Sequence, residues 1–266
     1  MIPGDTHVHS CFSSDSQATM EENVLSAIDK GMPWICMTDH IDYDFPEPEM
    51  VFEFEMAPYF ETLSELKEKY KDRIEVLAGV EIGMLKEAKK KNEYLIRSYP
   101  FDFCIGSQHL VFNRDPYYPD VFEAHTDREV YREYFEETLD NIRAFHSFDS
   151  LGHLDYVLRY GKEVKHYRYS EFAEVLDEIL KLLLRYNIAL EVNTAGLRKG
   201  LRTTNPQVEV LKRYRELGGT LITIGSDAHQ SYYIGYGFDY TAGLLKSLGF
   251  THTARYVSHH PKFTPL

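Results

Sequence analysis

The chain has 266 residues, carries a formal net charge of −13 and is 43% hydrophobic. That length is sufficient for one large domain with a sizeable core, and the acidic balance argues against a broad basic surface for nucleic acid. No apolar run reaches the length that spans a membrane. The sequence shows no hydrophobic leader after Met1, and its three cysteines, Cys11, Cys36 and Cys104, lack C-x-x-C spacing. These features predict a cytoplasmic protein with reduced thiols.

Short apolar runs alternate with amphipathic helical patterns along the whole chain. The runs predicted as strands are 6–9, 34–38, 74–80, 101–106, 150–155, 188–192, 220–225 and a short final 255–257. The helices predicted between them are 19–30, 56–71, 85–97, 127–145, 170–185, 206–217 and 239–248. About seven βα units without a linker predict a single α/β domain over 1–266, with a parallel sheet. At this length a closed α/β barrel is favoured over an open sheet, and the chain carries no Gly-rich dinucleotide fingerprint.

Two long loops interrupt this alternation. The first, 110–126, is polar and aromatic and holds two prolines, and the second, 156–169, is basic and aromatic. A structureless loop of that length inside a compact domain is more typical of an active site than of a simple connection. We therefore expect the first loop to contribute to substrate recognition.

Each of the first seven predicted strands ends in a histidine or a carboxylate. The residues at these ends are His7, His9, Asp39, His40, Glu81, His109, His153, Asp155, Glu191, Asp227 and His229. In a strand, residues i and i+2 share a face, and the functional residues of an α/β barrel lie at the C-terminal ends of its strands. A single buried histidine is usually a hydrogen-bonded core residue. Six histidines at strand ends predict a metal centre instead, and imidazole with carboxylate ligands suits Zn²⁺, Mn²⁺ or Fe²⁺.

The order of these motifs resembles the PHP superfamily, which is named for polymerase and histidinol phosphatase domains. The motifs are His7-x-His9, Thr38-Asp39-His40, Gly79-x-Glu81, Ser107-x-His109, Gly152-His153-x-Asp155 and Ser226-Asp227-Ala228-His229. The resemblance spans nearly the whole chain. It implies a distorted (β/α)7 barrel with three divalent metal ions at the C-terminal face of the strands.

The same resemblance implies a ligand for each of the three ions. The first would be held by His7, His9, Glu81 and Asp227, and Glu81 would bridge to a second ion on His109 and His153. The third would be held by Asp15, His40 and His229. Many relatives carry a histidine at the position of Asp15, and the alternative interpretation of this aspartate is a cap in the Ser-rich turn 13–16.

Within the superfamily, the chain is similar to the histidinol-phosphate phosphatases. The stretches that carry this similarity are TDHIDYDF, YPFDFCIGSQH and GHLDYVLRYG. The resemblance implies hydrolysis of a small phosphate monoester, L-histidinol phosphate, to L-histidinol and phosphate in histidine biosynthesis. The expected chemistry is in-line attack by a hydroxide that the metal ions activate.

Further residues are expected to serve as acid and as substrate ligands. Asp42 is preferred over His229 as the general acid. The alternative interpretation, equally compatible with the local sequence, is that the carboxylate of Asp42 only caps a loop. The residues expected to bind phosphate are Arg198, as first choice, with Arg159 and Arg202, each of which is alternatively a surface arginine. Those expected to contact the rest of the substrate are Asp115 or Glu123, Tyr117 or Tyr118, and Ser107.

Three alternatives remain open at this stage. The first is a 3′-5′ nuclease or phosphodiesterase on the same centre, which the acidic charge disfavours. The second is a phosphoesterase for nucleotides or other small esters, and the third is a non-catalytic metal-binding barrel. We expect a small-molecule partner, with neither nucleic acid nor membrane, and leave the oligomeric state open.

Overall fold

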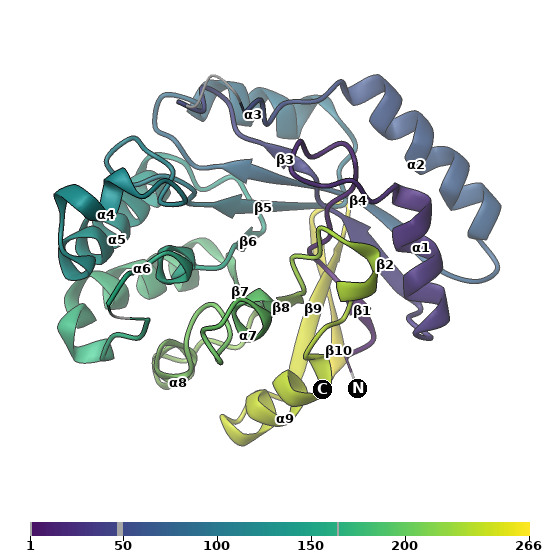
Figure 1. Ribbon diagram of the computed structural model, residues 1–266. Coiled ribbons are helices and arrows are strands. Elements are labelled where there is room, and N and C mark those ends of the chain that lie inside the picture. The colour runs from purple at the N-terminus through teal and green to yellow at the C-terminus, as the bar shows by residue number, and fades with distance from the viewer. Residues whose placement is uncertain (1, 47–49, 164) are drawn as a thin grey trace.

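A nearly closed parallel barrel forms the framework of the molecule (Figure 1). The computed structural model describes residues 2–46, 50–163 and 165–266. The parallel strands are β1 (Gly4–Asp5), β2 (Trp34–Met37), β3 (His40–Ile41), β4 (Glu75–Gly83), β5 (Phe103–Ser107), β6 (Ser150–Leu151), β7 (Ala189–Asn193) and β8 (Ile222–Gly225). They follow the order β1-β2-β4-β5-β6-β7-β8, and β3 pairs with the C-terminal half of β4. The predicted distorted (β/α)7 barrel in a single domain is confirmed.

The histidine pair at the N-terminus closes this barrel. The prediction placed a strand at 6–9, whereas the regular strand is Gly4–Asp5. The following residues continue as extended chain, with Val8 bridging Ala228 in parallel. The N–H of Asp227 donates to the carbonyl of His7 and the N–H of His9 donates to the carbonyl of Ala228, both at 2.9 Å. The segment that carries the two histidines therefore joins the end of β1 to the residues that follow β8.

Helices cover the outside of the sheet, as Figure 1 shows. Their bounds are α1 (Met20–Asp29), α2 (Met56–Tyr70), α3 (Lys89–Ser98), α4 (Asp120–Ala124), α5 (Asp127–Ala144), α6 (Ala173–Tyr186), α7 (Ala195–Arg198), α8 (Val208–Glu216) and α9 (Phe238–Ser247), with 3₁₀ turns at Tyr156–Arg159, Tyr169–Glu171 and Ser231–Tyr233. Capping boxes begin α1 and α5, where Thr19 pairs with Glu22 and Thr126 with Glu129. Within the described residues, none of these helices combines the length and apolar character needed to cross a membrane.

A C-terminal hairpin closes the N-terminal end of the barrel. It consists of β9 (His252–Val257) and β10 (His260–Pro265), joined by Ser258 and His259 in the left-handed region. The prediction found only 255–257, because the two prolines and the polar residues of β10 are atypical of a strand. The imidazole of His259 lies 2.8 Å from the carboxylate of Asp149, and its backbone N–H donates to the carbonyl of Asp102. These contacts attach the hairpin to the loops that precede β5 and β6.

The interior of the barrel changes character from one end to the other. Near the hairpin it is an apolar cluster of Trp34, Cys36, Leu77, Phe103, Ile105, Ala189, Leu221, Ala254 and Tyr256. Side chains on one face of a strand recur at every second residue. The inward face of β4 therefore runs from Leu77 through Gly79 to Glu81, and that of β7 runs from Ala189 to Glu191 and Asn193. The C-terminal end of the same interior is polar.

Candidate metal centre

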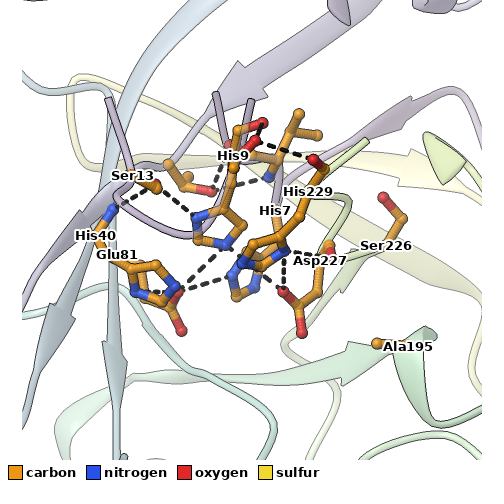
Figure 2. Close-up of polar contacts among 12 residues, drawn as sticks. His7, His9, Ser13, His40, Glu81, Ala195, Ser226, Asp227 and His229 are labelled. Atoms are coloured by element: carbon orange, nitrogen blue, oxygen red, sulfur yellow. Dashed lines mark hydrogen bonds and ion pairs between the residues drawn. The ribbon is translucent and has the colours of Figure 1, made fainter. Parts of the chain in front are cut away.

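One buried carboxylate, that of Glu81 in β4, lies at the middle of a cluster of histidines. Five imidazoles approach it, two of them from the segment after β1 and the others from residues in or just after three further strands, and Glu81 itself is fully buried. The nitrogen-to-oxygen distances are 3.1 Å for His7, 3.4 Å for His9, 3.1 Å for His40, 3.2 Å for His109 and 2.9 Å for His153. Figure 2 shows the rings of His7, His9, His40 and His229 directed toward one another, with Glu81 and Asp227 on either side.

The nine predicted metal ligands form overlapping groups around this carboxylate. Ligand atoms lie within 4.8 Å of one another in the groups His7–His9–Glu81, Glu81–His109–His153 and His9–His40–His229. A carboxylate oxygen of Asp227 lies 3.6 Å from Nε2 of His9, next to the first group. Asp15 is partly exposed and lies 2.9 Å from Nε2 of His229 and 4.0 Å from Nε2 of His40. The fold thus brings close together the residues of each set that the resemblance to the PHP superfamily implied for one ion.

The donor atoms fit divalent ions. Imidazole nitrogens with carboxylate oxygens are the ligands that Zn²⁺, Mn²⁺ and Fe²⁺ accept. Within the described part of the chain, the buried Nε2 of His9 and Nδ1 of His153 have no hydrogen-bond partner. A buried polar atom without a partner is costly, and a bound ion would satisfy the nitrogen of His9 that faces Glu81.

Electrostatics in the cluster depend on which charges surround each group. Burial raises the pKa of Glu81, but His7, His40 and His109 outweigh burial and hold this pKa well below its ordinary value. Burial lowers the pKa of His7, and the carboxylates of Glu191 and Glu81 more than compensate, so this pKa lies well above its ordinary value. Burial, together with His229 and His40, lowers the pKa of His9. These directions favour the ionised carboxylate of Glu81 and a proton on His7, which a metal ion would displace.

A cavity of about 370 Å³ opens on this cluster. Its inner wall includes Asp15, His40, His109, His153, Asp227 and His229. Its outer wall is aromatic and includes Phe45, Phe52, Tyr117, Tyr118, Tyr156 and Tyr160. A concave site with a charged floor and apolar sides suits a small molecule that has an anionic end and a ring.

Arg159 is the arginine that the fold places in this cavity. It belongs to the 3₁₀ turn after β6, is buried, and lies 2.9 Å from a carboxylate oxygen of Asp227. Its guanidinium also donates to the side-chain oxygens of Asn205 at 3.2 Å and Asn193 at 3.1 Å. Burial lowers the pKa of Arg159, but Asp227 outweighs burial and raises it. A fixed, charged guanidinium beside a metal ligand is a suitable group for a phosphoryl oxygen.

Three other residues predicted to bind substrate lie outside the cavity in the described structure. Arg198 donates to the backbone carbonyl of Asp227 at 2.5 Å and lies over the ring of Tyr233. Arg202 is exposed, and Ser107 is buried behind the cluster, where a Cβ on Gly152 would meet its hydroxyl. Arg198 was the first choice for binding phosphate. In the structure its guanidinium instead donates to the backbone carbonyls of Ser226 and Asp227, and so helps to hold the loop after β8.

Asp42 occupies the edge of the cavity beside two metal-ligand candidates. One of its oxygens lies 2.6 Å from Nδ1 of His109 and the other 3.5 Å from Nδ1 of His40. Burial raises its pKa, but the neighbouring His109 and His40 outweigh burial and lower it. This environment favours the ionised carboxylate, so a role as acid rests on position and not on a resident proton.

The long loop after His109 forms part of the cavity wall. Asp115, Tyr117 and Tyr118 line the cavity, and the carboxylate of Asp115 accepts the N–H of Tyr117 at 2.8 Å. Glu123 is exposed on the short helix α4. The loop therefore offers one carboxylate and two aromatic rings to a ligand.

Sequence reasoning missed several residues of the site. Lys199 lines the cavity, and burial together with Arg159 lowers its pKa to about 8. Tyr156 and Tyr160 form part of the outer wall. Behind the ligands, the strand-end residue Asp39 accepts hydrogen bonds from the hydroxyls of Ser10 and Ser13, and the hydroxyl of Ser13 contacts Nδ1 of His9. The two serines were not predicted. The position of Lys199 next to Arg198 was the available signal for that lysine, and the aromatic character of loop 156–169 was the signal for the two tyrosines.

Comparison with known proteins agrees with this geometry. The PHP domain family matches residues 5–195. Histidinol-phosphatase from Lactococcus lactis subsp. lactis is 37% identical over 227 residues, covering 85% of this chain and 83% of the relative. A protein from Clostridium acetobutylicum named "Probable histidinol-phosphatase" is 37% identical, covering 88% of this chain and 89% of the relative.

A solved structure extends the comparison to the fold. The crystal structure of histidinol phosphate phosphatase from L. lactis, complexed with zinc, L-histidinol and phosphate, superposes with a TM-score of 0.91. The two proteins are 33% identical in that alignment, which covers 98% of each chain. The motif order, the barrel and these matches agree, and the chain therefore belongs to the PHP domain family, among its histidinol-phosphatase members.

Proposed function

We propose that this protein is a metal-dependent histidinol-phosphatase, which hydrolyses L-histidinol phosphate to L-histidinol and phosphate. The observation that carries the proposal is the convergence of five imidazoles on Glu81 at the floor of a cavity that also holds Arg159. The relatives named histidinol-phosphatase and the L. lactis complex with zinc, L-histidinol and phosphate support the choice of substrate.

Three divalent ions, Zn²⁺, Mn²⁺ or Fe²⁺, are proposed to occupy the centre. His7, His9, Glu81 and Asp227 would hold the first, Glu81 with His109 and His153 the second, and Asp15 with His40 and His229 the third. Bound there, such ions supply a water of lowered pKa and positive charge against the phosphoryl oxygens. The buried carboxylates and imidazoles fix where that charge lies.

Arg159 is proposed to bind a phosphoryl oxygen. Its guanidinium is held by Asn193, Asn205 and Asp227, so little side-chain entropy is lost when it meets the substrate. Arg198, Arg202 and Ser107 stay predictions with less support, since all three lie outside the cavity. For Arg198, wild-type kinetics in the Arg198→Ala variant would remove it from the site.

The loop after His109 is proposed to recognise the leaving alcohol. Histidinol carries an amine and an imidazole, and the carboxylate of Asp115 is placed to pair with a cation at the cavity mouth. The rings of Tyr117 and Tyr118 are placed to contact the imidazole. Glu123 has weaker support, because it is exposed on α4.

Asp42 is proposed as the group that passes a proton to the leaving alkoxide, with His229 as the alternative. Asp42 lines the cavity and shares a short contact with His109. A metal-bound His229 would have no free proton on its coordinating nitrogen, which favours Asp42. An Asp42→Asn variant that keeps its metal should lose far more kcat on histidinol phosphate than on p-nitrophenyl phosphate. The alkoxide that leaves histidinol phosphate needs a proton, whereas p-nitrophenolate leaves without one.

The binding partner and the cellular location of the protein also form part of the proposal. A small phosphate monoester is the proposed partner rather than nucleic acid or a membrane surface, and the cytoplasm is the proposed location. The acidic net charge of −13 disfavours a polyanionic partner.

One assay tests the proposal. Purified protein loaded with Zn²⁺, Mn²⁺ or Fe²⁺ is offered histidinol phosphate, p-nitrophenyl phosphate, a nucleoside monophosphate, bis(p-nitrophenyl) phosphate and single-stranded DNA. We expect the highest kcat/KM on histidinol phosphate and none on DNA. Turnover of the diester or DNA without the monoesters would overturn the proposal, and metal binding without any turnover would favour a non-catalytic barrel. The His9→Gln variant is the matched inactive control.

A further inference from the structure

A second buried carboxylate, that of Glu191 in β7, lies directly behind the metal-ligand candidates. It is fully buried and faces the barrel interior between β6 and β8. One oxygen lies 2.6 Å from Nδ1 of His7, and the other accepts the backbone N–H of His153 at 2.8 Å and the side-chain amide of Asn193 at 3.1 Å. Both carboxylate oxygens are therefore used, and the acid contacts two different ligand residues.

The contact with His7 determines which ring nitrogen faces the centre. Because Nδ1 donates its proton to Glu191, Nε2 is the nitrogen directed at Glu81, at 3.1 Å. A histidine binds a metal through one nitrogen, and the hydrogen bond made by the other nitrogen fixes the tautomer and the ring orientation. Glu191 thus presents the correct nitrogen of His7 without itself lying among the cavity-lining residues.

Space for this pair exists because β8 ends in a glycine. A Cβ at Gly225 would lie 2.3 Å from Cβ of His7 and 2.7 Å from a carboxylate oxygen of Glu191. Real Cβ atoms do not approach other atoms so closely, so any side chain at 225 would separate the two residues. The absence of a side chain at Gly225 therefore lets His7 and Glu191 approach each other next to β8.

The same carboxylate also connects to the proposed phosphate ligand. Asn193 donates to Glu191, and the oxygen of its amide accepts from the guanidinium of Arg159. That guanidinium in turn lies 2.9 Å from Asp227. A continuous chain of polar contacts therefore runs from His7 through Glu191 and Asn193 to Arg159.

We infer that Glu191 is a positioning residue that orients the metal-binding face of His7 and, through Asn193, the guanidinium of Arg159. The second half of this inference rests on the proposed function, because it takes Arg159 as a phosphate ligand. The first half concerns metal binding alone. Glu191 neither touches the substrate cavity nor counts among the nine predicted metal ligands.

Metal retention is the first measurement, and it needs no substrate. Zinc is titrated against a chromophoric chelator in the wild type, in Glu191→Gln and in Asp102→Asn, a control that removes a mostly buried carboxylate at the hairpin end of the barrel, outside every group of candidate metal ligands in the described residues. A glutamine at 191 cannot accept from His7, His153 and Asn193 at once, so its zinc dissociation constant should rise about 10- to 100-fold. Asp102→Asn should match the wild type.

A double variant separates orientation of His7 from general damage. In a His7→Asn background, Glu191→Gln should cause no additional loss of zinc affinity, because the ring it orients is already absent. If Glu191→Gln does not fold, as judged by circular dichroism, the same titration is made with Glu191→Asp, whose charge is kept but whose carboxylate is withdrawn by one methylene.

Inorganic phosphate probes the second half. With zinc saturating, the inhibition constant of inorganic phosphate should rise about tenfold in Asn193→Ala, because the guanidinium of Arg159 loses one of the side chains that hold it. Wild-type zinc affinity in both Glu191 variants would overturn the positioning of His7. Wild-type phosphate inhibition in Asn193→Ala would overturn the connection to Arg159. If histidinol phosphate is not a substrate, zinc titration still decides the role of Glu191.

Discussion

The two ends of the barrel interior are built from the same strands but are stabilised in opposite ways. At the N-terminal end, Trp34, Leu77, Phe103 and their neighbours pack against Ala254 and Tyr256 of the hairpin. At the C-terminal end, the inward residues are imidazoles and carboxylates, and most are fully buried. The first end gains stability by removing apolar surface from water. The second removes charged groups from water, which costs free energy unless the charges are paired.

This difference assigns a separate task to each end. The apolar end needs no ligand, since its hairpin completes the packing. The polar end holds Glu81 and Asp227 out of solvent, and despite this burial both carboxyls have a pKa well below the ordinary value, because Arg159 lies beside Asp227 and imidazoles lie beside both. In return, the carboxylates of Glu191 and Glu81 outweigh burial and raise the pKa of His7, which favours a proton on this imidazole when no metal is present. A divalent ion would replace this proton as the positive charge. The apolar end is thus expected to stabilise the fold, while the polar end carries out the chemistry.

The largest effect is expected from removing the carboxylate that the histidines share. In Glu81→Gln, two of the proposed metal groups lose a ligand, and kcat/KM should fall on the order of a thousandfold or more with loss of bound metal. Glu75→Gln is the matched control, because Glu75 begins the same strand at its exposed end. Metal analysis and circular dichroism should show a folded, metal-poor variant. Full metal content in Glu81→Gln would contradict the division between the two ends.

Arg159→Lys tests whether the polar end also binds the phosphoryl group. Lysine keeps the charge but cannot reproduce the guanidinium contacts to Asn193, Asn205 and Asp227, so kcat/KM should fall roughly 10²-fold. Metal content should remain unchanged. Steady-state kinetics on histidinol phosphate measure the effect, with Arg143→Ala on the outer face of α5 as the control. Equal loss in both variants would show that the effect does not arise in the cavity.

Prediction from sequence succeeded where a residue's role follows from its place on a strand. The period of two put His7 and His9 on one face, and the alternation of strands and helices predicted a barrel whose C-terminal strand ends meet. Those two rules were sufficient to gather eight of the nine ligand candidates, whereas Asp15 depended on resemblance to the PHP superfamily. The boundaries of the first strand and of β6 were wrong because short barrel strands give way to loops at the site.

Loop residues were harder to predict, because their direction depends on tertiary contacts. Arg159 and Arg198 both follow strand ends, yet one enters the cavity and the other turns to the carbonyls of Ser226 and Asp227. Nothing in the local sequence distinguishes them. Glu191 was recognised as a strand-end carboxylate, but its role behind His7 depends on the glycine at 225, on a different strand.

Tyr256→Ala should affect the apolar end alone. The ring of Tyr256 is buried and stacked on Phe103 with a centroid distance of 5.1 Å. Loss of the ring leaves an empty space in the packing of the apolar end, and the free energy of unfolding should fall by about 3 kcal/mol. Denaturant unfolding of the zinc-loaded protein measures this, with Phe263→Ala, an exposed position on β10, as the control. Zinc affinity of the folded variant should match the wild type, and a parallel loss of zinc would contradict the independence of the two ends.

The smallest effect is expected from pH, and it should appear only at the polar end. Burial lowers the pKa of His40, but Glu81, Asp42 and Asp15 outweigh burial and raise it from 6.5 to about 9. A raised folded-state pKa stabilises the metal-free protein fully below pH 6.5, and this contribution is lost as the pH rises toward 9. Between pH 6.5 and 8 the metal-free protein should therefore lose stability. Zinc must displace the same proton, so its affinity should rise by about tenfold per pH unit for each proton released. Thermal unfolding and zinc titration across this range measure both slopes, and His40→Gln should reduce them. A zinc affinity that does not change with pH would show that the imidazoles at the polar end are already neutral before metal binds.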